Sequence, residues 1–154
     1  MKKRSVLLAG CIGSVLVVSS LMAADTVAPG DVKIENIAVS ESLTGVAGDP
    51  AAGRKAFANK KLGNCLACHV NADLADQLFH GEVGPSLDGA GGRWAEPQLR
   101  AILVNAKAVF TDRTIMPAFY SLEVGDNVRK DLVGKTILNA QQVEDIIAYL
   151  TTLK

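Results

Sequence analysis

The feature that most constrains this chain is a pair of cysteines two residues apart with a histidine directly after the second, Cys65-Leu66-Ala67-Cys68-His69. Two thiols at this spacing can each form a thioether with a vinyl group of one porphyrin. The next residue then lies under the iron, where its imidazole can act as an axial ligand. This pattern is typical of covalent c-type haem attachment. The sequence therefore predicts one haem c held by Cys65 and Cys68, with His69 on the iron.

Other uses of a cysteine pair are less well supported by the surrounding sequence. A thioredoxin-like redox pair needs a βαβ context, and the pattern predicts no such unit around Cys65. A zinc site needs a third and a fourth ligand at suitable spacing, and His80 is the one further soft ligand that the chain supplies. Two cysteines in an exported protein can also form a disulfide, but the histidine directly after the pair favours haem.

The first 24 residues have the three parts of a secretory signal peptide. A basic start, Lys2-Lys3-Arg4, is followed by an apolar run from residue 6 to residue 21 and by small residues that end at Ala24. The sequence therefore predicts export to the periplasm with cleavage near Ala24. The mature chain is then divided into an N-terminal extension, residues 25–48, and a helical domain, residues 49–154.

Two other interpretations of this leader stay open. The apolar run approaches the length that spans a bilayer, so an uncleaved membrane anchor is one alternative. Leu8-Ala9-Gly10-Cys11 also resembles a bacterial lipobox, which would place a lipid on Cys11. The lipobox is disfavoured because few apolar residues precede Cys11 and the apolar run continues well past it. Cleavage is favoured because all three parts of a signal peptide are present.

Composition excludes several classes of protein once the leader is set aside. Removing three basic residues from 16 leaves 13 Lys and Arg against 16 Asp and Glu over 130 residues, which is one domain's length. A net charge of −3 gives no excess of positive charge to neutralise the phosphates of a nucleic acid. An apolar content of 49% excludes a disordered chain. A single long apolar stretch excludes a multi-pass membrane protein, and we expect no stable membrane insertion after cleavage.

Hydrophobic periodicity predicts three helices in the mature chain. The first begins at Asp49-Pro50, a cap followed by a proline at the first helical position, and stops before Gly63. The second spans residues 97–110, and the third spans residues 139–153 with Asn139 and Gln142 as a capping box. The segment between residues 84 and 92 is predicted to be a glycine-rich loop. The fold class is therefore all-α.

The second axial ligand of the iron has two candidates. Met116 is the one methionine left after the leader, and Pro117 keeps its segment out of a helix. His80 is the rival, but it follows His69 by only 11 residues. Because Met/His ligation is common in cytochromes c, Met116 is the predicted ligand.

These residues resemble the class I cytochromes c and, more narrowly, the SoxX family, which are the small monohaem subunits of SoxAX complexes in bacterial thiosulfate oxidation. The resemblance covers residues 49–154. Its SoxX part also rests on the local sequence Gly84-Pro85-Ser86-Leu87-Asp88-Gly89 and on a long insert after the methionine. The motifs that carry the class I resemblance occur in this order: Gly53-x-x-x-Phe57, Cys65-x-x-Cys68-His69, Gly84-Pro85-x-Leu87, Met116-Pro117 and Ala148-Tyr149-Leu150.

The resemblance implies a class I cytochrome c domain around one covalent haem, with His69 and Met116 on the iron. It also implies that the Pro85 carbonyl accepts a hydrogen bond from His69 and that Arg93 contacts a haem propionate. The implied partners are a SoxA-type cytochrome subunit, the SoxYZ sulfur carrier and an electron-accepting cytochrome c.

In such a complex, an L-cysteine S-thiosulfotransferase, the sulfur chemistry belongs to the partner subunit and this chain relays electrons. A free class I cytochrome c that shuttles electrons between other proteins is the alternative function. A haem sensor with a labile distal ligand is a third.

Overall fold

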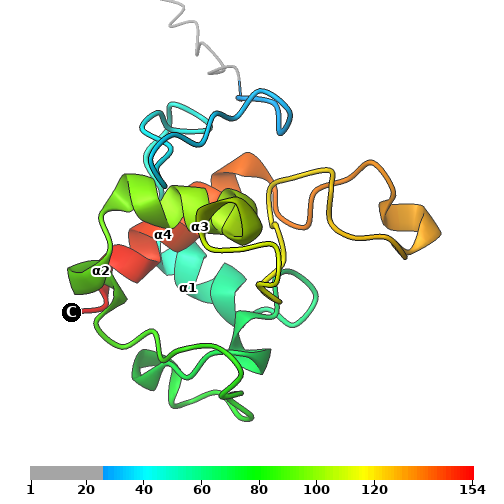
Figure 1. Ribbon diagram of the computed structural model, residues 1–154. Coiled ribbons are helices and arrows are strands. Elements are labelled where there is room, and N and C mark those ends of the chain that lie inside the picture. The colour runs from blue at the N-terminus through cyan, green and yellow to red at the C-terminus, as the bar shows by residue number, and fades with distance from the viewer. Residues whose placement is uncertain (1–25) are drawn as a thin grey trace, which may run out of the picture.

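The computed structural model describes residues 26–154, so the predicted leader lies outside the described residues. The helices of this part are α1 (Pro50–Ala58), α2 (Ala90–Arg93), α3 (Glu96–Val109) and α4 (Ala140–Thr152), with short 3₁₀ turns at Cys65–Ala67, Ala72–Leu74 and Lys130–Leu132. Helix α4 packs against each of the other three α-helices, so it forms the centre of the domain (Figure 1). The only β-type pairing in residues 26–154 is an isolated bridge between Glu35 and Ala38. The predicted all-α class is confirmed.

The ends of α1 and α4 follow from their capping residues. The Asp49 carboxylate accepts a hydrogen bond from the Ala51 amide at 2.8 Å, and Pro50 occupies the first turn. At α4, Asn139 and Gln142 exchange bonds of 2.8 and 3.0 Å, which is the predicted capping box. The predicted stop of the first helix at Gly63 is wrong, because α1 ends at Ala58.

The crossing of α1 and α4 is close enough to require a glycine. A β-carbon built on Gly53 would lie 1.9 Å from the backbone oxygen of Asp145, so no other residue fits without moving a helix. Phe57, one turn later, is 2% exposed, and its ring meets that of Tyr149 edge-on with centroids 5.8 Å apart. The close approach at Gly53 and the burial of Phe57 give a physical reason for the Gly53-x-x-x-Phe57 motif.

The glycine-rich segment differs from the prediction at its end. Gly91 and Gly92 belong to the short helix α2 rather than to a loop. A β-carbon on Gly91 would lie 2.4 Å from the Thr151 carbonyl oxygen, and the Gly91 amide bonds to the Leu153 oxygen at 2.9 Å. The glycine therefore serves a close contact with the end of α4, which composition alone does not reveal.

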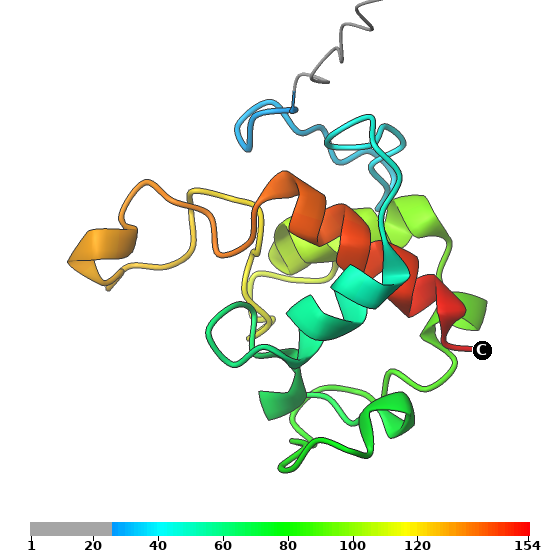
Figure 2. The same ribbon diagram turned by 180° about the vertical axis from the view of Figure 1, so that it is seen from behind.

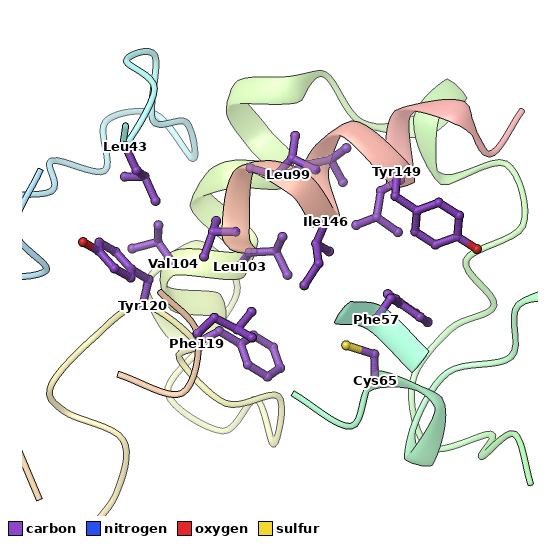
Figure 3. Close-up of a cluster of buried hydrophobic side chains, with 14 of the residues drawn as sticks. Leu43, Phe57, Cys65, Leu99, Leu103, Val104, Phe119, Tyr120, Ile146 and Tyr149 are labelled. Atoms are coloured by element: carbon purple, nitrogen blue, oxygen red, sulfur yellow. The ribbon is translucent and has the colours of Figure 1, made fainter. Parts of the chain in front are cut away.

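The N-terminal extension lies beside α3 and α4 (Figure 2), and a buried ion pair between these helices anchors it there. Arg100 of α3 and Glu144 of α4 are 3% and 4% exposed and are joined by two bonds of 2.9 Å. Arg100 also donates to the Val39 carbonyl at 2.9 Å, and Glu144 accepts from the Leu43 amide at 2.7 Å. Leu43 itself enters the hydrophobic core (Figure 3).

The segment between residues 121 and 137 projects from the domain in both ribbon views (Figures 1 and 2). A hydrogen bond of 3.0 Å from the Leu138 amide to the Phe119 carbonyl closes its base. Its one turn of 3₁₀ helix begins at Lys130. Apart from this turn, the segment contains no regular secondary structure.

We expect Gly53→Ala to lower the free energy of unfolding by about 3 kcal/mol, the upper end for an overpacked contact. The cause is the clash with the Asp145 backbone oxygen, which no rotamer can relieve. Denaturant unfolding of the purified holoprotein measures the change. Gly92→Ala is the control, because a β-carbon there has no neighbour within 4 Å. Equal stability of the two variants would contradict the close crossing.

We expect Glu144→Leu to cost about 3 kcal/mol of unfolding free energy, since it leaves the buried Arg100 guanidinium with only the exposed Glu96 carboxylate as its charged partner. The double variant Glu144→Leu/Arg100→Leu should be more stable than the single one, because it removes the buried charge. Asp131→Ala, which breaks an exposed ion pair with Arg129, is the control and should leave the unfolding midpoint unchanged. An additive loss in the double variant would show that the two charges do not depend on each other.

Candidate functional site

One cavity of about 560 Å³ collects most of the predicted site residues. It lies among the Cys65–Ala67 turn, the loop at residues 83–87, helix α3 and the segment at residues 114–119. The predicted haem attachment and ligand residues Cys65, Cys68, His69, Pro85 and Met116 all line it. The remaining walls are mostly aliphatic or aromatic, and they include Phe57, Leu87, Trp94, Leu99, Ile102, Leu103, Phe110, Phe119 and Leu150.

The cysteine pair is presented by a tight turn. Asn64 enters it in the left-handed region, at φ 51°, and the amides of Cys68 and His69 both bond to the Cys65 carbonyl at 3.1 and 3.0 Å. The two cysteines are not joined by a disulfide. Figure 3 shows the Cys65 sulfur turned toward the hydrophobic cluster.

Burial of the Cys65 side chain raises the pKa of its thiol to about 12. The group therefore stays protonated at neutral pH. A redox-active cysteine pair needs the opposite, a thiol whose pKa is lowered so that the nucleophilic thiolate is populated. The burial of Cys65 therefore gives this thiol none of the thiolate character that a redox-active cysteine needs.

The orientation of His69 is set by a backbone carbonyl. Its Nδ1 lies 2.7 Å from the Pro85 oxygen. Because a carbonyl oxygen only accepts hydrogen bonds, Nδ1 is the donor of this bond. The other ring nitrogen, Nε2, is then the one available to bind a metal ion. The predicted pairing of His69 with Pro85 is thus present in the geometry.

Gly84 allows the loop to approach the imidazole closely. A β-carbon on Gly84 would lie 2.4 Å from Cε1 and 2.7 Å from Nδ1 of His69. Any side chain there would push the ring away from the Pro85 carbonyl. The glycine that composition placed in a simple loop is therefore required by contact with the histidine.

The two candidates for the second axial ligand lie in different surroundings. Met116 is half-buried, packs against the hydrophobic core and lines the cavity. His80 does not line the cavity. Its Nδ1 lies 3.4 Å from the Asn71 amide nitrogen, and its Nε2 lies 3.1 Å from the Leu74 oxygen. Both nitrogens of His80 therefore have backbone partners, and only Met116 shares the cavity with His69.

Arg93 lies outside the cavity lining, whereas its neighbour Trp94 forms part of the wall. The Arg93 guanidinium donates to the carbonyl oxygens of Ser86, at 2.8 Å, and of Asp88. Arg93 thus holds the loop that carries Pro85. The Trp94 ring meets Phe110 edge-on, with centroids 6.0 Å apart, and the two close one side of the cavity.

The apolar walls of the cavity are not among the site residues predicted from the sequence. Leu99 and Leu103 lie on the helix predicted over residues 97–110, and both are buried and also line the cavity. Phe119 follows Met116 closely and has the same double role. A stripe that faces a bound group has the same periodicity as one that faces protein, so the pattern cannot separate them.

The residues of the cavity fit a haem. Two thiols, one correctly oriented imidazole and one thioether line a single space whose other walls exclude water. Among residues 26–154, no cluster of three or more His, Cys, Asp or Glu side chains is arranged to hold a metal ion without such a group.

Comparisons with known proteins agree with this site. The cytochrome c family model matches residues 50–154. Cytochrome c2 of Rhodospirillum rubrum is 30% identical over 130 residues, which is 70% of this chain and 99% of that protein. The crystal structure of SoxXA from P. pantotrophus contains a chain that is 44% identical, with a TM-score of 0.78. The match covers 84% of this chain and 99% of that one.

The predicted fold family and cofactor are therefore confirmed, and the role of the chain is electron transfer. None of the helices in residues 26–154 is both long and apolar enough to cross a membrane. The chain belongs to the cytochrome c family, as a SoxX-type monohaem cytochrome that carries one covalently bound haem c.

Proposed function

We propose that this chain is the electron-relay subunit of a periplasmic SoxAX complex that conjugates thiosulfate to a cysteine of the SoxYZ carrier. The observation that carries this proposal is the match to the SoxXA chain at 44% identity, which extends over 99% of that chain. Because the match covers 84% of this protein, it exceeds the 105 residues of the cytochrome c family match and includes sequence outside the haem domain.

The proposed iron site uses the residues that line the cavity. Cys65 and Cys68 form the two thioethers, and His69 and Met116 are the axial ligands. The 2.7 Å contact of His69 with Pro85 supports the first ligand, and the position of Met116 in the same cavity supports the second. The propionate contact of Arg93 stays a prediction, and so do the domain boundaries at residues 24 and 48.

The bound haem supplies a one-electron couple, and the protein controls how easily it is used. Pro85 keeps the His69 ring in one orientation and increases its basicity. The apolar walls, Phe57 and Leu99 among them, keep water from the iron, so that little has to rearrange when the charge changes. These are the properties of a relay rather than of a site that binds and converts a substrate.

The sulfur chemistry is assigned to the partner subunit. Joining thiosulfate to a cysteine forms one sulfur–sulfur bond, releases the thiol proton and releases two electrons. This chain takes up those electrons one at a time and passes them to another cytochrome c. Cys65 and Cys68 are the only cysteines after residue 24. No thiol of the mature chain is then left to act as a nucleophile.

The complex is tested by purification and by deletion. We expect the exported chain to copurify with a larger cytochrome subunit of the SoxA type, and its deletion to abolish thiosulfate-dependent reduction of the acceptor cytochrome. Restoring the wild-type chain is the control. A monomeric chain whose deletion leaves thiosulfate turnover intact would instead identify a free electron shuttle.

We expect Met116→Ala to remove the long-wavelength sulfur-to-iron absorption band of the ferric protein and to let the ferrous protein bind carbon monoxide. The reduction potential should fall, because a neutral thioether favours ferrous iron. His80→Ala is the control and should keep the band, since both ring nitrogens contact the backbone. Absence of the band from the wild-type ferric protein, with carbon monoxide binding gained by His80→Ala and not by Met116→Ala, would assign the ligand to His80.

A further inference from the structure

We propose that Asp88 is a positioning residue for the proximal imidazole: its carboxylate holds the Pro85 loop in the place where the Pro85 carbonyl can bind His69. The inference rests on the part of the proposed function that makes His69 an iron ligand. It does not depend on the partner subunit or on thiosulfate.

The loop from Gly84 to Gly89 has no helix or strand to hold it, so its position depends on individual bonds. On one side it runs along the haem-attachment segment. The Gly84 amide bonds to the Cys68 oxygen at 2.7 Å, and the Leu87 amide bonds to the Val70 oxygen at 2.9 Å. These two bonds flank Pro85, which has no amide hydrogen of its own to contribute.

Asp88 continues this row of contacts with its side chain. Its Oδ1 accepts a hydrogen bond of 2.7 Å from the Ala72 amide, at the start of the Ala72–Leu74 turn. Its backbone carbonyl accepts from Arg93, which also binds the Ser86 carbonyl. Two interactions thus hold the loop at Asp88. Its carboxylate bonds to the start of the Ala72–Leu74 turn, and its backbone carbonyl accepts a bond from the Arg93 guanidinium of α2.

This double attachment bears directly on the histidine. The Pro85 carbonyl is three residues from Asp88, and Gly84 leaves no free space beside the imidazole ring. A loop released at Asp88 can therefore move the carbonyl away from Nδ1. A weaker bond to Nδ1 makes the imidazole less basic, and a less basic ligand stabilises ferric iron less. The reduction potential should then rise.

Three variants of the full-length holoprotein separate position from charge. Asp88→Ala removes the bond and the negative charge. Asp88→Asn removes the charge but keeps an oxygen that can accept from the Ala72 amide. Ala72→Pro removes the donor and leaves the Asp88 charge in place. Proline suits this position because Ala72 is the first residue of its turn and Asn71 before it is extended, at φ −149° and ψ 108°.

We expect Asp88→Ala and Ala72→Pro each to raise the ferrous-to-ferric ratio at a fixed potential about threefold. That change corresponds to about 28 mV for one electron. Asp88→Asn should stay close to wild type. Potentiometric titration gives the ratio, and the exchange rate of the His69 Nδ1 proton, followed by NMR, should increase in the same two variants.

A shift in Asp88→Asn as large as that in Asp88→Ala, with none in Ala72→Pro, would overturn the proposal in favour of a simple effect of charge. An unchanged potential and an unchanged Nδ1 exchange rate in all three variants would overturn it as well. Because the isolated chain is measured, failure to find a SoxA-type partner would not affect the result. Loss of His69 ligation would appear separately in the absorption spectrum.

Discussion

The apolar cavity between α3 and the haem-attachment segment is the constraint on which the rest of this structure depends. Its volume is about 560 Å³, and its walls include Phe57, Leu99 and Phe119, which also belong to the hydrophobic core. A haem bound there removes the apolar surface of these walls from water, which stabilises the folded chain. The haem is therefore part of the hydrophobic core, and its two covalent bonds keep that part of the core in place.

Much of the fold follows from local signals in the sequence. The caps at Asp49 and Asn139, the proline that starts α1 and the apolar stripe of α4 each specify a helix through interactions within a few residues. The haem motif is equally local, because five consecutive residues contain both proposed attachment points and one proposed ligand. These elements could be predicted, and their ends were wrong only where no local signal marks them, as at Ala58.

Most of the remaining features depend on contacts between distant residues, whereas the break in α3 is local. Asn105 of α3 has φ −154° and ψ 93°, and its side chain accepts a bond of 3.1 Å from the Lys107 amide, so that α3 is interrupted there. The buried Arg100 and Glu144 are 44 residues apart, and nothing in the sequence near either charge identifies its partner. The apolar walls of the cavity have the same periodicity as ordinary core. These contacts form only when the chain folds, so one sequence alone does not identify them.

In the loop from Gly84 to Gly89, the same residues serve both the fold and the proposed redox function. The bonds that position Pro85 are ordinary loop contacts, at Gly84, Leu87 and Asp88, and their role in stability is local. They affect the proposed iron site only because the loop contacts the His69 imidazole, which Pro85 and Gly84 hold in one orientation. Hydrogen bonds of this kind transmit small shifts of the backbone to the proposed iron ligand His69, whereas no such chain of bonds leads to it from the exposed insert between residues 121 and 137. We therefore expect the residues that set the reduction potential to lie along the hydrogen bonds that lead from His69, rather than on the surface at positions near His69 in the sequence.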